Sequence, residues 1–165
     1  MKLKTLPELV GFFNAINLSA MNKISEIELS YKFYSNEILK VSDSQSAYDL
    51  LLNNWNLNTI ELQEEFKCLL LDRDNKVLGV YSLSKGGTAG TVVDVKLLMV
   101  TALKSKTHAI IIAHNHPSSN LKPSDQDKNL TKKIMDASNF LDITLLDHII
   151  LSNNGYYSFS DEGDI

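Results

Sequence analysis

An α/β (α+β) fold with a mixed β-sheet flanked by helices is predicted by three features of this sequence. Segments with apolar residues at helical spacing alternate with short apolar runs typical of strands. One run, residues 109–113, is apolar throughout, as expected of a strand buried on both faces. The last two runs flank a turn, which predicts a hairpin. With 165 residues, 44% of them hydrophobic, the chain can bury one domain core.

The sequence predicts two parts that differ in regularity. Up to about residue 35, Leu, Ile and Phe mix with Ser and Asn at no sustained period. We therefore expect residues 1–40 to form an N-terminal extension that packs on the domain. Residues 41–165 contain the strongly patterned segments and form the predicted domain.

A helix and a hairpin are predicted at the start of this domain. Either Ser42 or Ser44 can cap the helix. Its apolar residues recur at helical spacing: Ala47, Leu50, Leu51 and Trp55. The apolar runs 66–71 and 77–83 flank the turn-prone segment 72–75, which predicts a β-hairpin.

A loop and a second helix follow the hairpin. Residues 85–90 are too rich in glycine for regular structure, and the Lys-Ser/Thr ending of a phosphate-binding P-loop is missing. Asp94 can cap a helix that ends near Lys104. The residues expected to face inward from it are Leu97, Leu98, Val100, Thr101 and Leu103.

The buried strand is followed by a third helix and a second hairpin. The proline-marked loop 114–123 leads into a helix from Ser124 to about Phe140. Its expected inward residues are Leu130, Ile134, Ala137 and Phe140. The runs 143–151 and 156–159 are separated by a short turn and predict the hairpin.

The charge distribution bears on possible partners. A net charge of -4 argues against a dedicated nucleic-acid-binding domain, which is usually strongly basic. Residues 96–133 are locally basic, with only Asp125 and Asp127 as acids, so this stretch keeps nucleic acid as a candidate partner. A solvated helix face is the other explanation. The lysines of the stretch are Lys96, Lys104, Lys106, Lys122, Lys128, Lys132 and Lys133.

Cysteine content and hydropathy predict a cytoplasmic protein. The single cysteine, Cys68, cannot form an internal disulfide and is expected to be buried in a strand. No stretch approaches the roughly 18 to 20 apolar residues that cross a membrane. The first residues lack both a long apolar region and a signal cleavage site. We therefore expect no membrane association.

Three residues after the central run can meet at one metal ion. His114 and His116 project from the same face of the strand end, about 7 Å apart along the chain. Pro123 and Ser124 start a helix that returns Asp127, in its first turn, to the same place. Two histidines and one carboxylate are typical of catalytic zinc, which keeps a fourth position for water and lowers the pKa of that water to about 7. The sequence predicts zinc held by His114, His116 and Asp127.

Each of these residues also has another explanation. Ser124 and Asp127 can form a helix capping box, with Asp in place of the usual Glu. Either histidine alone can be a hydrogen-bonded polar residue at a strand end, but the joint arrangement favours metal. His108 is expected at the surface, and His148 is expected to be a satisfied buried polar residue that can also support a metal ligand.

The same residues resemble a known family motif. His-x-His-Pro, six residues, Ser, two residues and Asp is the JAMM motif of JAB/MPN-domain metalloproteins, and the chain matches it from His114 to Asp127. The resemblance runs from about Ile27 onward and is closest to the RadC family. Four strings are similar to that family: 114–118, 122–124, 145–149 and 156–159.

The resemblance implies a fold and an activity. The fold is cytidine-deaminase-like, with a mixed sheet between helices, and the activity is that of a zinc-dependent hydrolase of isopeptidase type acting on a peptide or isopeptide bond. Ser124 is implied to be catalytic, because its counterpart hydrogen-bonds the oxyanion of the tetrahedral intermediate. The family's name comes from DNA repair, so a nucleic-acid-associated accessory module is a second hypothesis.

One catalytic residue of the motif is not evident. By spacing, the glutamate that serves as general base should fall on the second strand of the first hairpin, where Tyr81 and Ser82 stand. The residues Glu61, Glu64 and Glu65 can fold over the site, although a solvated helix end is the favoured explanation of them. Loss of a general base typically slows a reaction by ~10²- to 10⁴-fold, so a catalytically silent scaffold is a third hypothesis.

Overall fold

A computed structural model of the chain describes residues 39–87 and 91–165. The expected N-terminal extension, residues 1–40, lies almost wholly outside these ranges, so its packing on the domain stays a prediction. The glycine-rich segment 85–90 also falls partly outside them. The described elements are α2 Ser44–Asn53, β1 Glu65–Leu71, β2 Val77–Lys85, α3 Val95–Lys104, β3 Ala109–Asn115, α4 Asp125–Asn139, β4 Thr144–Ser152 and β5 Gly155–Ser158.

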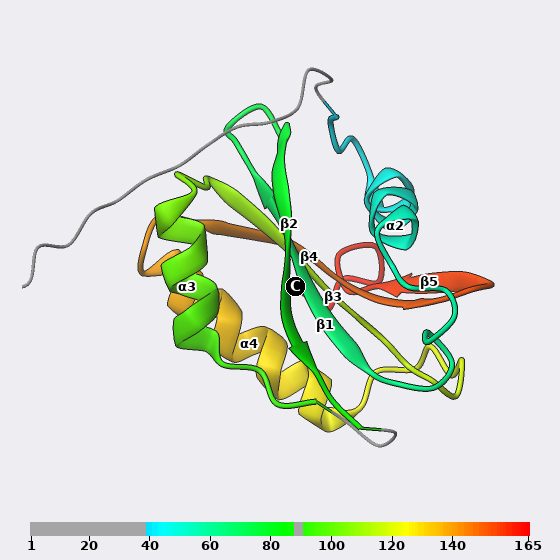
Figure 1. The fold of residues 1–165 in the computed structure, drawn as a ribbon. Helices are drawn as coiled ribbons and strands as arrows, with labels where there is room; N and C mark the ends of the chain where they lie inside the picture. The colour runs from blue at the N-terminus through cyan, green and yellow to red at the C-terminus, as the bar shows by residue number, and fades with distance from the viewer. Residues whose placement is uncertain (1–38, 88–90) are drawn as a thin grey trace, which may run out of the picture. The chain divides into compact units, whose positions relative to one another are not determined.

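The strands of the described ranges form one five-stranded sheet in the order β2-β1-β3-β4-β5. β3 and β4 pair in parallel, whereas the other neighbours pair antiparallel. Both predicted hairpins are present, one made by β1 with β2 and the other by β4 with β5. The predicted α/β fold with a mixed sheet flanked by helices is therefore confirmed (Figure 1).

The sheet separates two hydrophobic cores. α3 and α4 lie on one face of the sheet and α2 lies on the other (Figure 1). β1 and β3 are buried along their whole length, because their side chains alternate between the two cores. On β1, Leu69 and Leu71 pack in the core with α2, whereas Cys68 and Leu70 pack in the core with α3 and α4. The prediction that β3 is buried on both faces is confirmed.

Three residues that the sequence singled out lie where it predicted. Cys68 is fully buried, and burial raises the pKa of its thiol, so the side chain stays protonated and acts as a small apolar group. His108 is exposed just before β3, and His148 is fully buried in β4.

The predicted inward face of α3 is wrong in part. Leu98 is buried as expected, but Leu97, Val100 and Leu103 are 42%, 53% and 54% exposed. The buried residues of α3 are Leu98, Met99 and Ala102. This helix is apolar on nearly every side, so residue spacing could not choose the face that packs on the sheet.

Two details of the other helices also differ from expectation. α2 is capped by Asp43 rather than by Ser42 or Ser44, because the Asp43 carboxylate accepts a hydrogen bond from the backbone N–H of Ser46. Phe140, expected to face inward, is 90% exposed, because it is the cap residue beyond the last turn of α4.

The basic stretch between residues 96 and 133 lies at the surface. All seven lysines between residues 96 and 133 are exposed, as a solvated surface requires. Lys128 lies 3.8 Å from Asp164, and Lys132 lies 3.1 Å from Asp136. Binding of nucleic acid by this stretch stays a prediction.

Within residues 39–87 and 91–165, no helix has the length and apolar character needed to cross a membrane.

Candidate metal centre

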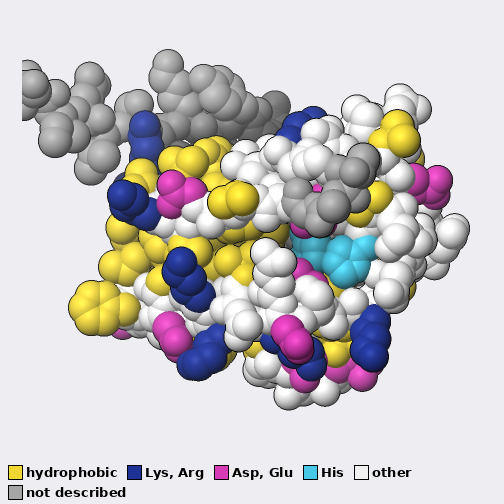
Figure 2. Space-filling view, turned by 90° about the horizontal axis from the view of Figure 1, so that it is seen from below, with side chains coloured by type: hydrophobic (Ala, Val, Ile, Leu, Met, Phe, Trp, Pro, Cys, Tyr) yellow, Lys and Arg dark blue, Asp and Glu magenta, His cyan; other side chains and the backbone are white. Residues whose placement is uncertain are grey.

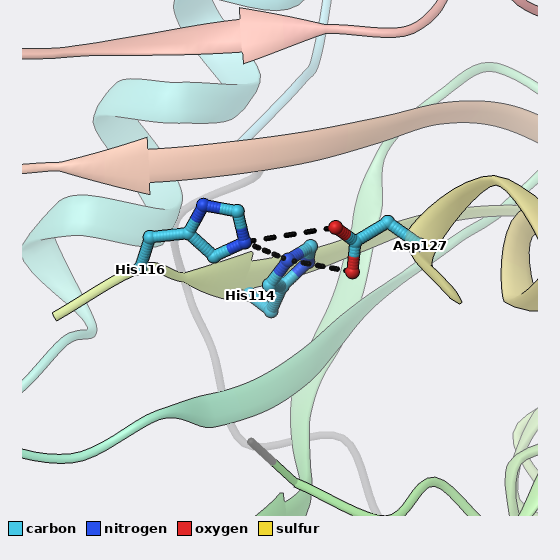
Figure 3. Close-up of side chains that lie close together, drawn as sticks. All are labelled: His114, His116 and Asp127. Carbon is cyan, nitrogen blue, oxygen red and sulfur yellow. Dashed lines mark hydrogen bonds and ion pairs between the residues drawn. The ribbon is translucent and has the colours of Figure 1, made fainter. Parts of the chain in front are cut away.

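The three predicted metal ligands converge at the end of β3. His114 is the next-to-last residue of β3, and His116 follows the strand directly. Asp127 lies in the first turn of α4. Their side chains point toward one another from these two elements (Figure 3). His114 Nε2 lies 2.9 Å from His116 Nε2 and 3.2 Å from Asp127 Oδ1. One ligand atom from each residue falls within 4.8 Å of the other two, so the fold brings together the set that the sequence predicted.

The capping explanation of Ser124 and Asp127 also holds, and it supports the site. Ser124 caps α4: its hydroxyl accepts from the Asp127 backbone N–H, and Asp127 Oδ2 accepts from the Ser124 backbone N–H at 2.8 Å. The Ser124 hydroxyl also donates to Oδ2, at 2.6 Å. With Oδ2 held in this way, Oδ1 is turned toward His114. The capping box therefore orients the carboxylate instead of competing with its role as a ligand.

The donor set fits a divalent metal. His116 Nδ1 lies 2.5 Å from the carbonyl oxygen of Asn120, and a carbonyl can only accept, so Nδ1 carries the hydrogen and a neutral His116 has a bare Nε2. His116 Nε2 faces His114 Nε2 and the carboxylate of Asp127. Lone pairs that point at one place are favourable only when a cation or a proton lies between them. Tetrahedral zinc with Zn–N distances of about 2.0 to 2.1 Å places two ligand nitrogens roughly 3.3 Å apart, close to the separation here.

The pKa values of this cluster shift as close contact dictates. Hydrogen bonding to Asp127 raises the pKa of His116, although burial opposes the shift. Burial raises the pKa of Asp127, but its contacts with His114, His116 and Ser124 outweigh burial and hold it well below its usual range. In the metal-free protein a proton on His116 can thus take the place of the cation.

This arrangement predicts opposite pH dependences with and without metal. In the metal-free protein, the raised pKa of His116 stabilises the folded state. This contribution is fully present below pH 6.5, the ordinary pKa of histidine, and is lost as pH rises through the raised pKa. A divalent metal such as zinc would have to displace that proton to bind His116, so the stabilisation that it gives should grow over the same pH interval. Urea unfolding between pH 5.5 and 8.5, with zinc or with a chelator, checks both trends. If the free energy of unfolding changed with pH in the same way with zinc and with the chelator, the assignment of His116 as a metal ligand would be contradicted.

A cavity of about 440 Å³ opens over the three residues. Histidine side chains are visible from outside on this side of the molecule (Figure 2). Its wall carries a carboxylate, Glu64, together with polar and apolar groups. Glu64 is half-buried and lies close enough to His116 for its charge to contribute to the raised pKa of that imidazole. The cavity thus combines the candidate metal site with a candidate proton acceptor.

Pairing of β1 with β3 explains why Glu64 lies here. Phe66 is the partner of His114 across this antiparallel pair, and their rings stack with centroids 6.1 Å apart. Because the strands run in opposite directions, Glu64 comes two residues before Phe66 on the side where His116 lies. The backbone of Glu64 is bonded to the glycine segment, with Gly86 N–H donating to its carbonyl at 2.8 Å.

Asn115, the residue between the two histidines, holds the Glu64 segment against β3. This side chain is fully buried. Its Oδ1 accepts from the backbone N–H of Glu65 at 2.7 Å, and its Nδ2 donates to the carbonyls of Ile60 and Gln63 at 2.6 and 2.9 Å. One side chain therefore fixes the position of the candidate base relative to the candidate ligands.

The structure shows which of the positions weighed for the motif glutamate lie at the cavity. Tyr81 pairs with Cys68 and Ser82 with Lys67, and neither Tyr81 nor Ser82 lines the cavity. Of the three glutamates weighed from the sequence, Glu61 is exposed and bonded to Asn153, and Glu65 is buried against Lys85 at 2.9 Å. Only Glu64 of these three lines the cavity.

Fold and site together define a class of protein. A mixed sheet between helices, with a His-x-His strand end facing an aspartate at the start of the next helix, is the arrangement of a JAB-type domain. A family model described as RadC-like JAB domain matches residues 41–164. The chain belongs to this family, which confirms the resemblance found in the sequence.

Relatives of the same family align over most of the chain. A UPF0758 protein of Flavobacterium johnsoniae is 38% identical over 159 residues, which cover 96% of this chain and 69% of that relative. A UPF0758 protein of Porphyromonas gingivalis is 37% identical over 163 residues, covering 96% of this chain and 70% of the relative. A UPF0758 protein of Trichodesmium erythraeum is 33% identical over 157 residues, covering 93% and 63%.

Proposed function

We propose that this chain is a zinc-dependent hydrolase that cleaves an amide or isopeptide bond. The observation that carries the proposal is the meeting of His114, His116 and Asp127 in a cavity that Glu64 also lines. Membership of a JAB-type family supports it. Zinc held by these ligands would supply a Lewis acid and lower the pKa of water at the open position to about 7.

Glu64 is the proposed general base. Its carboxylate stands in the cavity wall beside His116, where it can accept a proton from the attacking water and pass it to the leaving amine. The backbone bonds to Gly86 and Gly87 hold this residue in place. The proposal thus assigns the base to the residues just before β1, not to the second strand of the hairpin.

Ser124 is the proposed donor to the developing oxyanion. Its hydroxyl lines the cavity and donates to Asp127 Oδ2 at 2.6 Å, so it must turn toward the substrate to act. We expect Ser124→Ala to lower the free energy of unfolding by about 1 kcal/mol through loss of the cap, and kcat by roughly 10²- to 10³-fold. Asp94→Ala removes the cap of α3 and serves as control, because it should lower stability without lowering kcat. Equal kcat losses in both variants would contradict the role of Ser124.

A peptide and isopeptide library tests the proposal directly. The purified chain should hydrolyse members of the library after incubation with zinc, lose activity with a chelator and regain it when zinc is restored. The chelator should also lower Tm, because a ligand that binds only the folded state stabilises it by roughly 4 kcal/mol at 1,000 times its Kd. Bound zinc without turnover would favour the scaffold hypothesis, and no bound zinc would end the proposal.

A further inference from the structure

A chain of buried side chains lies behind the metal centre, on the side away from the cavity. His148 Nε2 is 2.9 Å from His114 Nδ1, and His148 Nδ1 is 2.6 Å from Thr131 Oγ1. Thr131 Oγ1 in turn is 2.7 Å from the backbone carbonyl of Asp127. Thr131 and His148 are 2% and 0% exposed. The chain therefore begins and ends on residues that carry candidate ligands, His114 and Asp127.

The available hydrogens fix the direction of every bond in this chain. A carbonyl only accepts, so Thr131 donates its single hydroxyl hydrogen to Asp127 and must accept from His148 Nδ1–H. His148 packs between Phe66 and Phe159 with ring centroids 5.9 and 4.7 Å away. A metal ligated by Nε2 of His114 leaves the one hydrogen of that imidazole on Nδ1, so His148 Nε2 accepts from His114 Nδ1–H.

We propose that Thr131 and His148 are positioning residues that fix His114 in the tautomer with its hydrogen on Nδ1 and its Nε2 lone pair facing the metal. The proposal rests on the zinc site of the proposed function. The two histidine ligands are then oriented by different means: His116 by the carbonyl of Asn120 in an exposed loop, and His114 by a buried chain. Without the Thr131 hydroxyl, His148 can carry its hydrogen on Nε2, and that hydrogen would force His114 into the tautomer that cannot bind metal.

Thr131→Val tests the chain with little change in side-chain shape. The variant should bind zinc roughly 10- to 100-fold more weakly, measured by competition with a chromophoric chelator. Thr131→Ser keeps the hydroxyl and should restore the affinity. Thr107→Val is the matched control. Thr107 is also buried, its hydroxyl has no hydrogen-bond partner among the described residues, and it lies before β3 rather than at the ligand end, so zinc affinity should not change.

Imidazole nitrogen shifts, measured by NMR in the zinc-loaded protein, give a second readout that does not depend on activity. His148 should show the tautomer with hydrogen on Nδ1 in the unchanged chain and in Thr131→Ser, and Thr131→Val should move it toward Nε2. Should Thr131→Val fail to fold, the tautomer in the unchanged chain still decides the matter.

The outcomes separate this proposal from the proposed function. An unchanged chain that binds no zinc overturns both. An unchanged chain that binds zinc overturns the positioning proposal alone if Thr131→Val binds it equally well, or if His148 carries its hydrogen on Nε2. Equal losses of affinity in Thr131→Val and Thr107→Val also overturn it, because they would reflect general destabilisation.

Discussion

Replacing either His114 or Asp127 with alanine is expected to abolish stoichiometric zinc binding. Each residue contributes one of three converging donor atoms, and His114 Nε2 lies within 3.2 Å of both partners. With one donor removed, the other two cannot complete a three-ligand site. Metal analysis of the purified proteins should find about one zinc per unchanged chain and little in either variant. The zinc-dependent rise in Tm should disappear with the metal.

His108→Ala is the control for loss of a histidine. His108 is exposed just before β3, at the opposite end of that strand from the ligands, so this variant should keep its zinc and its zinc-dependent Tm. Equal zinc in the unchanged chain and in both ligand variants would show that His114 and Asp127 do not bind the metal. Unequal effects are also informative, because Asp127 additionally forms the capping box of α4.

Glu64→Gln is expected to separate metal binding from catalysis. The amide keeps the size of the side chain and its place in the cavity wall, but it cannot accept a proton as a base. The variant should retain one zinc and the Tm of the unchanged chain, while kcat on any library substrate falls by ~10²- to 10⁴-fold. Metal analysis and initial rates on the same preparation check both halves of the expectation.

Glu61→Gln is the matched control for this substitution. Glu61 is three residues away in sequence, is exposed, contacts Asn153 and does not line the cavity. Its rate should match that of the unchanged chain. A Glu64→Gln protein with full activity would contradict the assignment of Glu64 as the general base.

Helices and strands were largely predictable because their signals are local. The apolar runs at residues 66–71 and 109–113 and the cap at Asp94 depend on neighbours in sequence, and the structure has each of them. The inward face of α3 was not predictable, since Leu97 and Leu103 are as apolar as Leu98. Which of them is buried depends on how the helix sits on the sheet, and no local pattern records that.

The candidate site, like the fold, was predictable from the sequence only in part. Spacing alone placed His114 and His116 on one face and brought Asp127 back to them, because a strand end, a short loop and a helix start leave little choice of geometry. The position of Glu64 depends on which strand pairs with β3 and in what register, and the spacing of residues along the sequence does not reveal either.

The sequence by itself determined the class of fold, the family, and a compact set of three residues suited to a metal. Only the tertiary structure decided which carboxylate shares the cavity with them, and it alone joined Thr131 and His148 to the back of His114. The physical reason is the range of the interactions. The three ligands lie within 14 residues of one another along the chain, counting from His114 to Asp127, whereas Glu64 and His148 reach the site through pairing of separate strands.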